Sequence, residues 1–355
     1  MASRASSRCL LTSAAAWASE VVPTCLRTTR TRFSPSGSLT QSHRPEARRR
    51  LLLVTGFWPT PDQPSAGVFV ARRVGVEQIT VVAPGSYRGS VAGRYMRLGW
   101  RALTARGRFD GVEAHPLFPA GLIGLLAARA RRRPLVVVAH GSDVRLTAVR
   151  NRRYRFLARL VIRGAEAVVA NSADSAQHVA ALGGRATVIP PGVDRALFEP
   201  TPRPSRRRIL YLGGTDANKG YQTARRHATT LAGPGLRTLS PEEVAHEMSA
   251  HDIVLVPSYA EGYGLVAAEA VAAGRWVVAR RVGGLTEIVE DGVTGTLVDD
   301  EAGFSAAIAA VPDYDPFAVA ARSRAPSIDE TRSALGEVWA RVLAAHGDVP
   351  ASPNR

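Results

Sequence analysis

The sequence of 355 residues predicts an α/β protein with two Rossmann-like, doubly wound domains that face a central cleft, the second of them shortened. Three observations lead to this prediction. Short β-branched runs alternate with helical segments, and the runs are apolar throughout, as are strands buried on both faces of a parallel sheet. A proline-rich segment at 199–208 interrupts the alternation, which then restarts. The composition, 45% hydrophobic and 21% charged, is that of a globular protein long enough for two domains.

The pattern divides the chain into five parts. These are a basic N-terminal extension (1–48), a first domain (49–198), the linker (199–208), a second domain (209–325) and a C-terminal helix with a tail (326–355). The extension is rich in Ser, Thr and Arg and has only a short, mildly apolar run. A transit peptide or a start codon assigned too far upstream fits it as well as a signal peptide does, and we leave it out of the fold.

The strands of the first domain are expected at 51–55, 79–83, 111–114, 135–139, 167–170 and 186–190. Helical segments lie between them, for example at 119–133 and 172–182. The expected strands of the second domain are 209–213, 236–239, 252–258 and 276–279, and its helices follow position 219 and span 241–250 and 264–273. Ligands of such sheets bind beyond the carboxyl ends of the strands, so unusual residues there are the candidate ligand contacts.

The charge is distributed unevenly. Residues 1–170 carry 28 Arg against 8 acids, whereas residues 171–355 carry 18 Lys and Arg against 22 acids. This asymmetry indicates an anionic partner for the first half, a membrane surface or nucleic acid, although a coding bias toward Arg with a solvated face explains it equally well. No zinc-finger or RNP motif accompanies the charge, which makes nucleic acid the weaker choice.

Neither a membrane span nor a cysteine-based site is expected. No apolar run reaches 18 residues, so no membrane span is predicted. The two cysteines, Cys9 and Cys25, both fall in the N-terminal extension, so we expect neither a disulfide framework nor a cysteine metal site in the folded part.

Lys219 is the only lysine in the chain; every other cationic side chain is an arginine. It follows the turn GGTDAN after the first strand of the second domain, at the start of a helix. A compact ammonium at this place can act as a point charge on a phosphate, where arginine would require bidentate geometry. Chance survival of one lysine is the alternative, but it would favour a solvated helix face over a glycine-bounded loop.

Two carboxylates accompany a helix that has no polar face. Glu261 stands in a turn with Gly262 and Gly264, and Glu269 lies within the apolar helix that follows. A lone buried carboxylate is costly unless a charged or hydrogen-bonding partner meets it. The two acids are predicted to hold ligand hydroxyls; the structural alternative for Glu269 is a salt bridge to one of the arginines.

Two further positions lie at the expected ligand edge. His140 ends a buried strand and precedes a glycine, where it can touch a reacting centre, although a purely structural histidine is at least as common. Gly67 belongs to the small-residue stretch 65–67, where a loop enters a helix whose N-terminus suits an anion. Neither a dinucleotide fingerprint nor a P-loop is present.

The segment 145–163 contains seven arginines and no acid. As a helix, it aligns Arg152, Arg155 and Arg159 along one stripe, which predicts contact with an anionic membrane surface or with the acceptor; a merely solvated face is the alternative. Each basic residue near an anionic leaflet contributes about 1 kcal/mol, reduced by salt.

With these residues in view, positions 51–310 resemble the family 4 glycosyltransferases of the GT-B fold and are similar to retaining mannosyl- and glucosyltransferases of bacteria. The ordered set of motifs is more specific than any single one: PSAGVFV, FDGVEAH, HGSDV, ANSADSAQHVAALG, VIPPGVDRALFEP, NKG, VPSYAEGYGLVAAEAVAAG and VGGLTEIVEDGVTGTLVD. The strongest single signature is the pair of glutamates at 261 and 269, separated by seven residues.

The resemblance implies a transfer of a hexose from a UDP- or GDP-sugar to an acceptor hydroxyl, on a glycan, a lipid, a phosphoinositide or a small molecule, with no metal or other cofactor. His140 would lie by the anomeric carbon and the hydroxyls of the transferred sugar. Lys219 would hold the diphosphate, and Glu261 the hydroxyls of the sugar. Stabilisation of the departing diphosphate would be the main catalytic effect.

The resemblance also implies donor contacts that involve the protein backbone and the ribose of the nucleotide. Gly67 would lie near the donor phosphate and the acceptor. The backbone of Gly262, Tyr263 and Gly264 would hold the sugar, and Glu269 the ribose. We expect a cytoplasmic protein, and the basic segment 145–163 predicts peripheral attachment at the inner face of the plasma membrane.

Two departures from the family pattern bear on activity. Gly214 occupies the position where the family usually carries an arginine that accompanies the lysine. The interval from Lys219 to Glu261 is also short, as if one strand–helix unit of the second domain were missing. The competing hypotheses are therefore a catalytically weak GT-B protein that binds a membrane or nucleic acid, and a nucleotide-sugar epimerase, which the paired glutamates disfavour.

Overall fold

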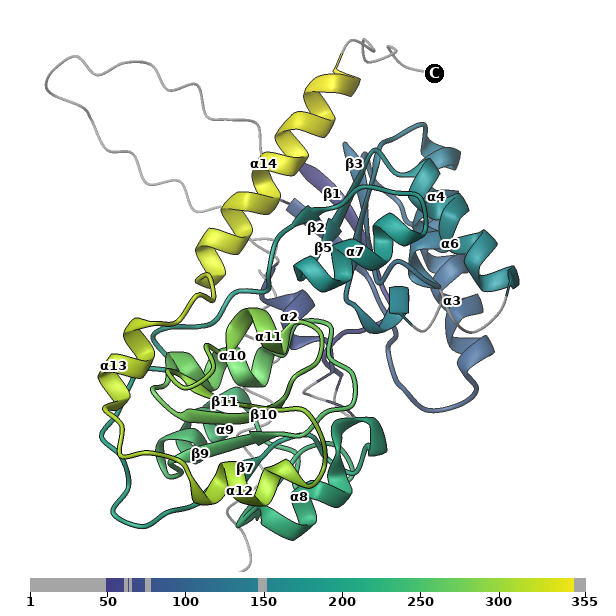
Figure 1. Ribbon diagram of the computed structural model, residues 1–355. Helices are drawn as coiled ribbons and strands as arrows, with labels where there is room; N and C mark the ends of the chain where they lie inside the picture. Colours follow the sequence, from purple (N-terminus) through teal and green to yellow (C-terminus); the bar gives the residue numbers. More distant parts are fainter. Residues whose placement is uncertain (1–48, 61–62, 64–65, 74–77, 146–151, 348–355) are drawn as a thin grey trace, which may run out of the picture. The chain divides into compact units, whose positions relative to one another are not determined.

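The computed structural model describes residues 49–60, 63, 66–73, 78–145 and 152–347 (Figure 1). The N-terminal extension and the two cysteines lie outside the described residues. Within them, two parallel sheets confirm the predicted pair of Rossmann-like domains.

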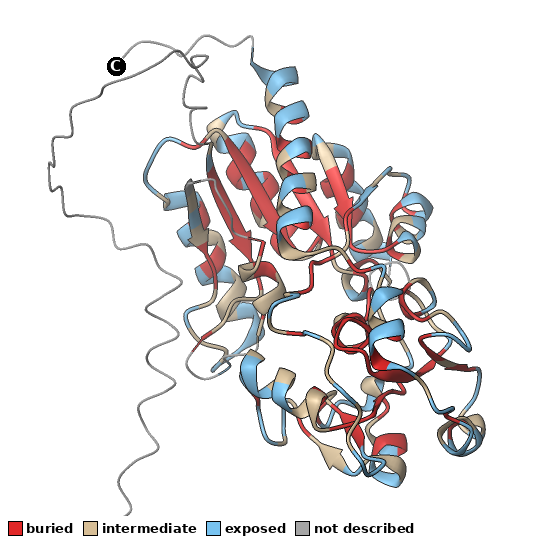
Figure 2. Cartoon of the chain, turned by 90° about the vertical axis from the view of Figure 1, so that its left-hand side faces the viewer, coloured by how far each residue is buried: buried red, intermediate tan, exposed pale blue. Residues whose placement is uncertain are grey.

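The first sheet has six strands in the order β2-β1-β3-β4-β5-β6. Their bounds are β1 (Arg50–Thr55), β2 (Gln78–Val82), β3 (Gly111–His115), β4 (Leu135–Ala139), β5 (Ala167–Ala170) and β6 (Thr187–Val188). Every pairing is parallel, for example Leu53 with both Val81 and Glu113. The central strands are buried throughout, as their continuous apolar runs predict (Figure 2).

Helices cover both faces of this sheet. The helices of the first domain are α2 (Val68–Ala71), α3 (Val91–Thr104), α4 (Ala120–Arg131), α6 (Arg152–Gly164) and α7 (Ala173–Ala181). On one face α3, α4 and α6 pack on Leu52, Val112 and Val137. The other face of the sheet is covered by α14 (Ile328–His346), which the chain reaches only after the second domain.

The second sheet has five strands in the order β11-β10-β9-β7-β8, one fewer than the first. The strands are β7 (Ile209–Tyr211), β8 (Thr230–Leu231), β9 (Ile253–Val256), β10 (Trp276–Arg280) and β11 (Gly295–Val298). Its helical elements are η1 (Ala217–Lys219), α8 (Tyr221–His227), α9 (Pro241–Ser249), α10 (Leu265–Ala272), α11 (Leu285–Ile288), α12 (Gly303–Ala309) and α13 (Pro316–Ala321).

One expected strand of this domain was misplaced. The segment 236–239 is a loop, and the strand beside β7 is β8, which begins six residues earlier in the chain than the expected strand. A turn with positive φ at Gly233 (116°) and Gly235 (80°) ends the strand early. The loop then folds back, so that Thr215 N donates to Pro234 O at 2.9 Å.

Candidate functional site

The lysine lies in a pocket at the carboxyl ends of β7 and β9. The cavity has a volume of about 450 Å³, and its polar lining includes Thr215, Asp216, Lys219, Ser258 and Glu261. Lys219 Nζ donates to Glu261 Oε1 at 2.7 Å, and Ser258 Oγ donates to the same oxygen at 3.3 Å. The structure therefore brings two of the predicted site residues together at the sheet edge where a ligand is expected.

Local geometry fixes the lysine in this position. Lys219 ends the short helix η1, whose N-cap Asp216 accepts from Asn218 N at 2.8 Å. Gly220 follows with φ of 73°, and a Cβ there would collide with Pro257 O. Only glycine allows the chain to turn here with the lysine facing the pocket.

The glycine-rich turn after Glu261 lies against the end of β4. A Cβ on Gly262 would collide with His140 O, and one on Gly141 would collide with the Gly262 backbone. Ser172 Oγ, at the N-cap of α7, donates to Gly262 O at 2.5 Å. His140 and the predicted sugar-binding turn thus meet through their backbones.

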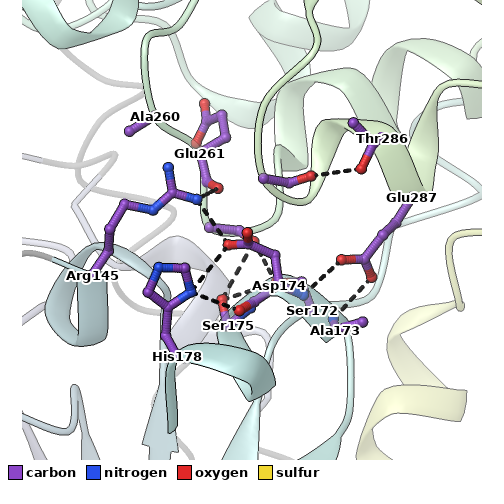
Figure 3. A network of polar contacts seen from close by, with 12 residues as sticks. Arg145, Ser172, Ala173, Asp174, Ser175, His178, Ala260, Glu261, Thr286 and Glu287 are labelled. Carbon is purple, nitrogen blue, oxygen red and sulfur yellow. Dashed lines mark hydrogen bonds and ion pairs between the residues drawn. The ribbon is translucent and has the colours of Figure 1, made fainter. Parts of the chain in front are cut away.

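A polar network surrounds this contact (Figure 3). Glu287 accepts from the N–H groups of Ala173 and Asp174 at 2.9 and 3.0 Å, which caps the N-terminus of α7 with a carboxylate from α11. Arg145 donates to Asp174 Oδ2 at 2.8 Å and to Glu261 O at 3.4 Å. Glu287 and Arg145 were not singled out in the sequence, because nothing local marks a partner from the other domain.

The turn after Glu261 leads directly into α10. Gly264 is the N-cap of α10 with φ of 98°, and Tyr263 beside it is 6% exposed. Burial raises the pKa of Tyr263, with the nearby Glu287 carboxylate adding to the effect. The phenol is therefore neutral in the folded protein.

Glu269 has the salt-bridge partner that was the structural alternative. Arg72 Nη1 lies 2.8 Å from Glu269 Oε1. Burial raises the pKa of Glu269, and the charge and hydrogen bond of Arg72 oppose the rise. The pair lines a pocket of about 190 Å³ that also contains Phe69 and shares Leu212, Pro234 and Val266 with the pocket of Lys219.

Gly67 is the N-cap of α2 and has φ of 71°. A Cβ at this position would meet the backbone of Phe57 and Trp58 at 2.5–2.7 Å, so the residue must be glycine. Phe69, two residues on, packs edge-on against the His140 ring at 4.9 Å. Gly67 is therefore followed closely in the chain by two contacts of the site. Phe69 packs against His140, and Arg72 pairs with Glu269.

His140 is the outer end of a buried polar chain that the sequence did not reveal. Its Nε2 lies 2.9 Å from His115 Nδ1, and His115 Nε2 lies 2.7 Å from Glu113 Oε1. Burial lowers the pKa of His140 well below its usual value, and the neighbouring His115 and the positive charge of Arg73 act in the same direction. The alternation Glu-x-His on one strand would have been the signal for two side chains on the same face.

The backbone around His140 is held by Asp143. Its carboxylate accepts from His140 N at 2.9 Å and from Leu117 N at 2.7 Å, which ties the ends of β4 and β3 together. Burial raises the pKa of Asp143 to about 6, while these backbone hydrogen bonds act in the opposite direction.

An arginine could not replace Gly214 in this backbone conformation. Gly214 has φ of 66°, and a Cβ would collide with the backbone of Pro234. Glycine is therefore required at this position by the local fold, because the loop after β8 occupies the space beside Gly214.

The three arginines of the predicted surface stripe lie on α6. Arg152 and Arg159 are exposed, whereas Arg155 is half-buried and its Nε is shielded without a hydrogen-bond partner. Residues 146–151, which belong to the same predicted basic segment, lie outside the described residues.

The described part of the chain has neither a candidate metal site nor a helix that could span a membrane. It contains no group of three His, Cys, Asp or Glu side chains that could hold a metal ion. None of its helices combines the length and the apolar character needed to cross a bilayer.

Known proteins resemble this chain in sequence and in structure. The model of Glycosyltransferase Family 4 matches residues 46–197, and that of Glycosyl transferases group 1 matches residues 203–312. A D-inositol 3-phosphate glycosyltransferase of Geodermatophilus obscurus is 33% identical over 269 residues, which are 58% of this chain and 60% of the relative. One of Mycobacterium tuberculosis is 32% identical over 253 residues, 54% of this chain and 51% of the relative. The chain thus spans between half and three fifths of the length of these curated relatives.

Solved structures agree on the fold. Sucrose-phosphate synthase from Thermosynechococcus elongatus superimposes with a TM-score of 0.70 at 17% identity, covering 84% of this chain and all of the other. Anabaena HepE in complex with UDP-glucose superimposes with a TM-score of 0.65 at 18% identity, covering 83% of this chain and all of the other. With both domains matched in sequence and the architecture matched in space, the chain belongs to glycosyltransferase family 4 and has the GT-B fold.

Proposed function

We propose that the protein is a retaining glycosyltransferase that moves a hexose from a UDP- or GDP-sugar to an acceptor hydroxyl without a metal ion. The observation that supports this most directly is the contact of Lys219 with Glu261 in the pocket at the ends of β7 and β9. In a nucleotide sugar the diphosphate is bonded to the anomeric carbon. A cation for the phosphate and a carboxylate for the sugar hydroxyls must therefore be neighbours, as these two groups are.

Each residue has a role in this proposal. Lys219 exchanges part of its contact with Glu261 for the diphosphate and stabilises the charge that develops on the leaving group. Glu261 and the backbone of Gly262 to Gly264 orient the sugar, and Glu269 reaches the ribose in the adjoining pocket. His140 faces the hydroxyls of the transferred sugar at the end of β4.

The absence of a second cation at Gly214 limits phosphate binding. Arg145, which also contacts Glu261 O, and Arg72 both already pair with acids, Asp174 and Glu269. The alternative, a GT-B protein that binds its ligand without catalysis, rests on this missing contact.

The single lysine permits a direct test of donor binding. Reductive methylation with ¹³C-formaldehyde labels the ε-amine of Lys219 and the N-terminal amine only, so one NMR signal reports on the pocket. UDP-glucose, GDP-mannose, UDP and GDP are titrated, and the donor that shifts the Lys219 signal is then assayed for hydrolysis and transfer with EDTA present. A shift with turnover supports the enzyme, a shift without turnover supports the binding protein, and no shift with any donor contradicts both.

We place the acceptor on the first domain. A pocket of about 290 Å³ at the carboxyl ends of β1 and β2 is lined by Phe57, Gln63, Tyr87, Arg94 and Tyr95, among others. Arg94 donates to Tyr87 O at 3.0 Å and stacks over the Tyr87 ring. Aromatic faces and a guanidinium suit a phosphorylated polyol, a class to which the acceptor in the names of the curated relatives belongs.

A membrane-linked acceptor is supported by the outer surface of α3, α4 and α6, which we name the basic–apolar face. The three helices contain no acid, and seven of their arginines are exposed: Arg97, Arg101, Arg129, Arg152, Arg153, Arg159 and Arg163. Large apolar side chains are exposed among them: Met96, Trp100, Leu103, Leu126, Phe156 and Leu160. All three helices cover the same face of the first sheet, so their outer sides face the same way (Figure 1).

This composition is that of an amphipathic surface lying in a membrane interface. Trp100 is 72% and Phe156 65% exposed, which is unusual for side chains of this size in water. We therefore propose peripheral attachment to an anionic inner leaflet and a lipid-linked acceptor such as a phosphoinositide. Comparing transfer to free inositol phosphate with transfer to phosphatidylinositol in vesicles identifies the acceptor class.

A further inference from the structure

A buried chain of polar side chains connects the end of β4 to the C-terminal helix. It runs from His140 through His115 to Glu113, and Trp339 Nε1 of α14 donates to Glu113 Oε2 at 2.7 Å. His115 is fully buried, Glu113 is 5% exposed and Trp339 1%. No part of the proposed transfer described so far uses the inner three residues.

The charge state of Glu113 follows from its surroundings. Burial raises the pKa of Glu113, but the hydrogen bonds from His115 and Trp339 and the charge of Arg73 outweigh it and hold the pKa below its usual value. Arg73 lines the same small cavity as Glu113 and Trp339. Glu113 is therefore an anion, which can only accept hydrogen bonds.

The anion determines the direction of every hydrogen bond in the chain. Because Glu113 Oε1 accepts, the proton lies on His115 Nε2. Burial lowers the pKa of His115 against the opposing effect of Glu113, so the ring is neutral and its Nδ1 carries a lone pair. That nitrogen accepts from His140, whose own proton must then lie on Nε2, and the Nδ1 of His140 remains a hydrogen-bond acceptor.

We propose that Glu113 and His115 are positioning residues that fix the tautomer and ring orientation of His140, so that its Nδ1 accepts a hydrogen bond from a hydroxyl of the transferred sugar. The proposal rests on the proposed function for the role of that hydroxyl, but the tautomer itself is independent of any substrate. Orientation of a histidine by a carboxylate through its second ring nitrogen is a general way of setting its chemistry. Here a second histidine lies between the two.

Glu113→Gln tests the proposal with no change of shape. Trp339 N–H can donate only to the carbonyl oxygen of the new amide, which leaves the NH₂ group to face His115 Nε2. His115 must then carry its proton on Nδ1 and donate to His140, whose proton moves to Nδ1. ¹⁵N NMR of the histidine-labelled full chain should show His140 as the Nε2–H tautomer in the wild type and as the Nδ1–H tautomer in Glu113→Gln.

A second variant separates this effect from damage to the fold. In Glu113→Gln/Trp339→Phe the indole donor is gone, the amide can turn its carbonyl to His115, and the wild-type tautomer of His140 should return. Trp339→Phe alone should keep the wild-type tautomer, because Glu113 remains an anion. Thermal unfolding of each variant shows whether it is folded.

Turnover supplies the functional readout. We expect kcat to fall at least tenfold in Glu113→Gln with the donor KM within twofold of the wild type, and to recover in part in the double variant. An Nδ1–H tautomer of His140 in the wild type, or the same tautomer in the wild type and Glu113→Gln, would overturn the proposal. A reversed tautomer with undiminished kcat would also overturn it. Absence of transfer by the wild type, with the tautomers as expected, would count against the proposed function instead.

Discussion

Lys219 is the residue on which donor binding should depend most. Its side chain is 35% exposed and its ammonium is 2.7 Å from Glu261, so it is held at the pocket yet accessible to a phosphate. Loss of a charge-assisted hydrogen bond costs on the order of 1.5–3 kcal/mol, or roughly ten- to 150-fold in affinity. We expect Lys219→Ala to weaken nucleotide binding by this factor and nearly abolish transfer, and Lys219→Arg to restore only part of both.

Isothermal calorimetry with the nucleoside diphosphate measures the effect. Glu261→Gln serves as the matched variant, because it frees the lysine from its partner without removing the cation. Nucleotide affinity in Lys219→Ala equal to that of the wild type would exclude the diphosphate contact.

Glu269 has two roles to separate, the salt bridge to Arg72 and the proposed ribose contact. Removing one member of a buried pair leaves the other charge unpaired, at a cost of about 3 kcal/mol or more. We expect Glu269→Ala to lower both the free energy of unfolding and nucleotide affinity. In Arg72→Met/Glu269→Ala stability should largely return, since no charge is stranded, while affinity stays low. Denaturant unfolding and calorimetry on the same preparations distinguish the two roles. If nucleotide affinity returned together with stability in the double variant, Glu269 would have a structural role only.

The buried histidines make stability depend on pH. The pKa of His140 is lowered by burial, so below about pH 6.5 the unfolded chain binds a proton there that the folded chain does not. The contribution of neutral His140 is complete above the unfolded pKa and decreases as the pH falls toward the folded pKa. For one proton the slope is at most about 1.4 kcal/mol per pH unit.

Comparison with His140→Gln isolates this group. The free energy of unfolding of the wild type, minus that of His140→Gln, should decrease from pH 7.5 to pH 5. The raised pKa values of Asp143 and Glu269 make stability change with pH in the opposite direction. Both residues are present in both proteins, so their effects largely cancel in the difference. A difference that is constant over this range would show that His140 is not buried in its neutral form.

At the scale of the element, α3, α4 and α6 present the basic–apolar face and should bind vesicles through it. We expect binding to rise with anionic lipid content and to fall between low and physiological salt. Arg152→Gln/Arg159→Gln should weaken binding by about 1 kcal/mol per arginine, and Trp100→Ser/Phe156→Ser should weaken it at all salt concentrations.

Vesicle co-sedimentation measures these effects. Arg206→Gln/Arg225→Gln, which removes two exposed arginines from outside this face, is the control with the same change of net charge and should bind as the wild type does. Equal sedimentation with neutral and anionic vesicles would leave a soluble acceptor in place of a membrane-linked one.

At the scale of the whole molecule, the first domain depends on α14, which follows the second domain in the chain. Trp339, Leu335, Val338 and Val342 pack on Leu51 and its neighbours across the sheet. Truncation of a buried tryptophan costs about 3–5 kcal/mol, so Trp339→Ala should lower the melting temperature substantially. Trp100→Ala, which removes the same side chain from an exposed site, should change it little. A similar small shift in both variants would mean that α14 does not complete the core.

Some site residues were predictable because their signals are local. The apolar strands, the glycines around Lys219 and Glu261, and the carboxylate inside an apolar helix all reflect backbone geometry or burial within one segment. His140 was placed at a strand end for the same reason. These features gave the fold class and the residues of the donor pocket.

Other features depend on contacts between distant segments, and no local pattern carries them. Arg72 was one of 45 arginines until Glu269 was seen 2.8 Å away, and the strand beside β7 was misplaced because a turn that packs on Gly214 ends it. The sequence by itself determined two parallel α/β domains and the family to which they belong, because periodicity and motifs are properties of short stretches. Only the tertiary structure decided that α14 completes the first domain and that Glu113 and His115 form a hydrogen-bonded chain with His140. These contacts depend on how separate elements pack and join distant residues, such as Glu113 and Trp339, which are 226 positions apart.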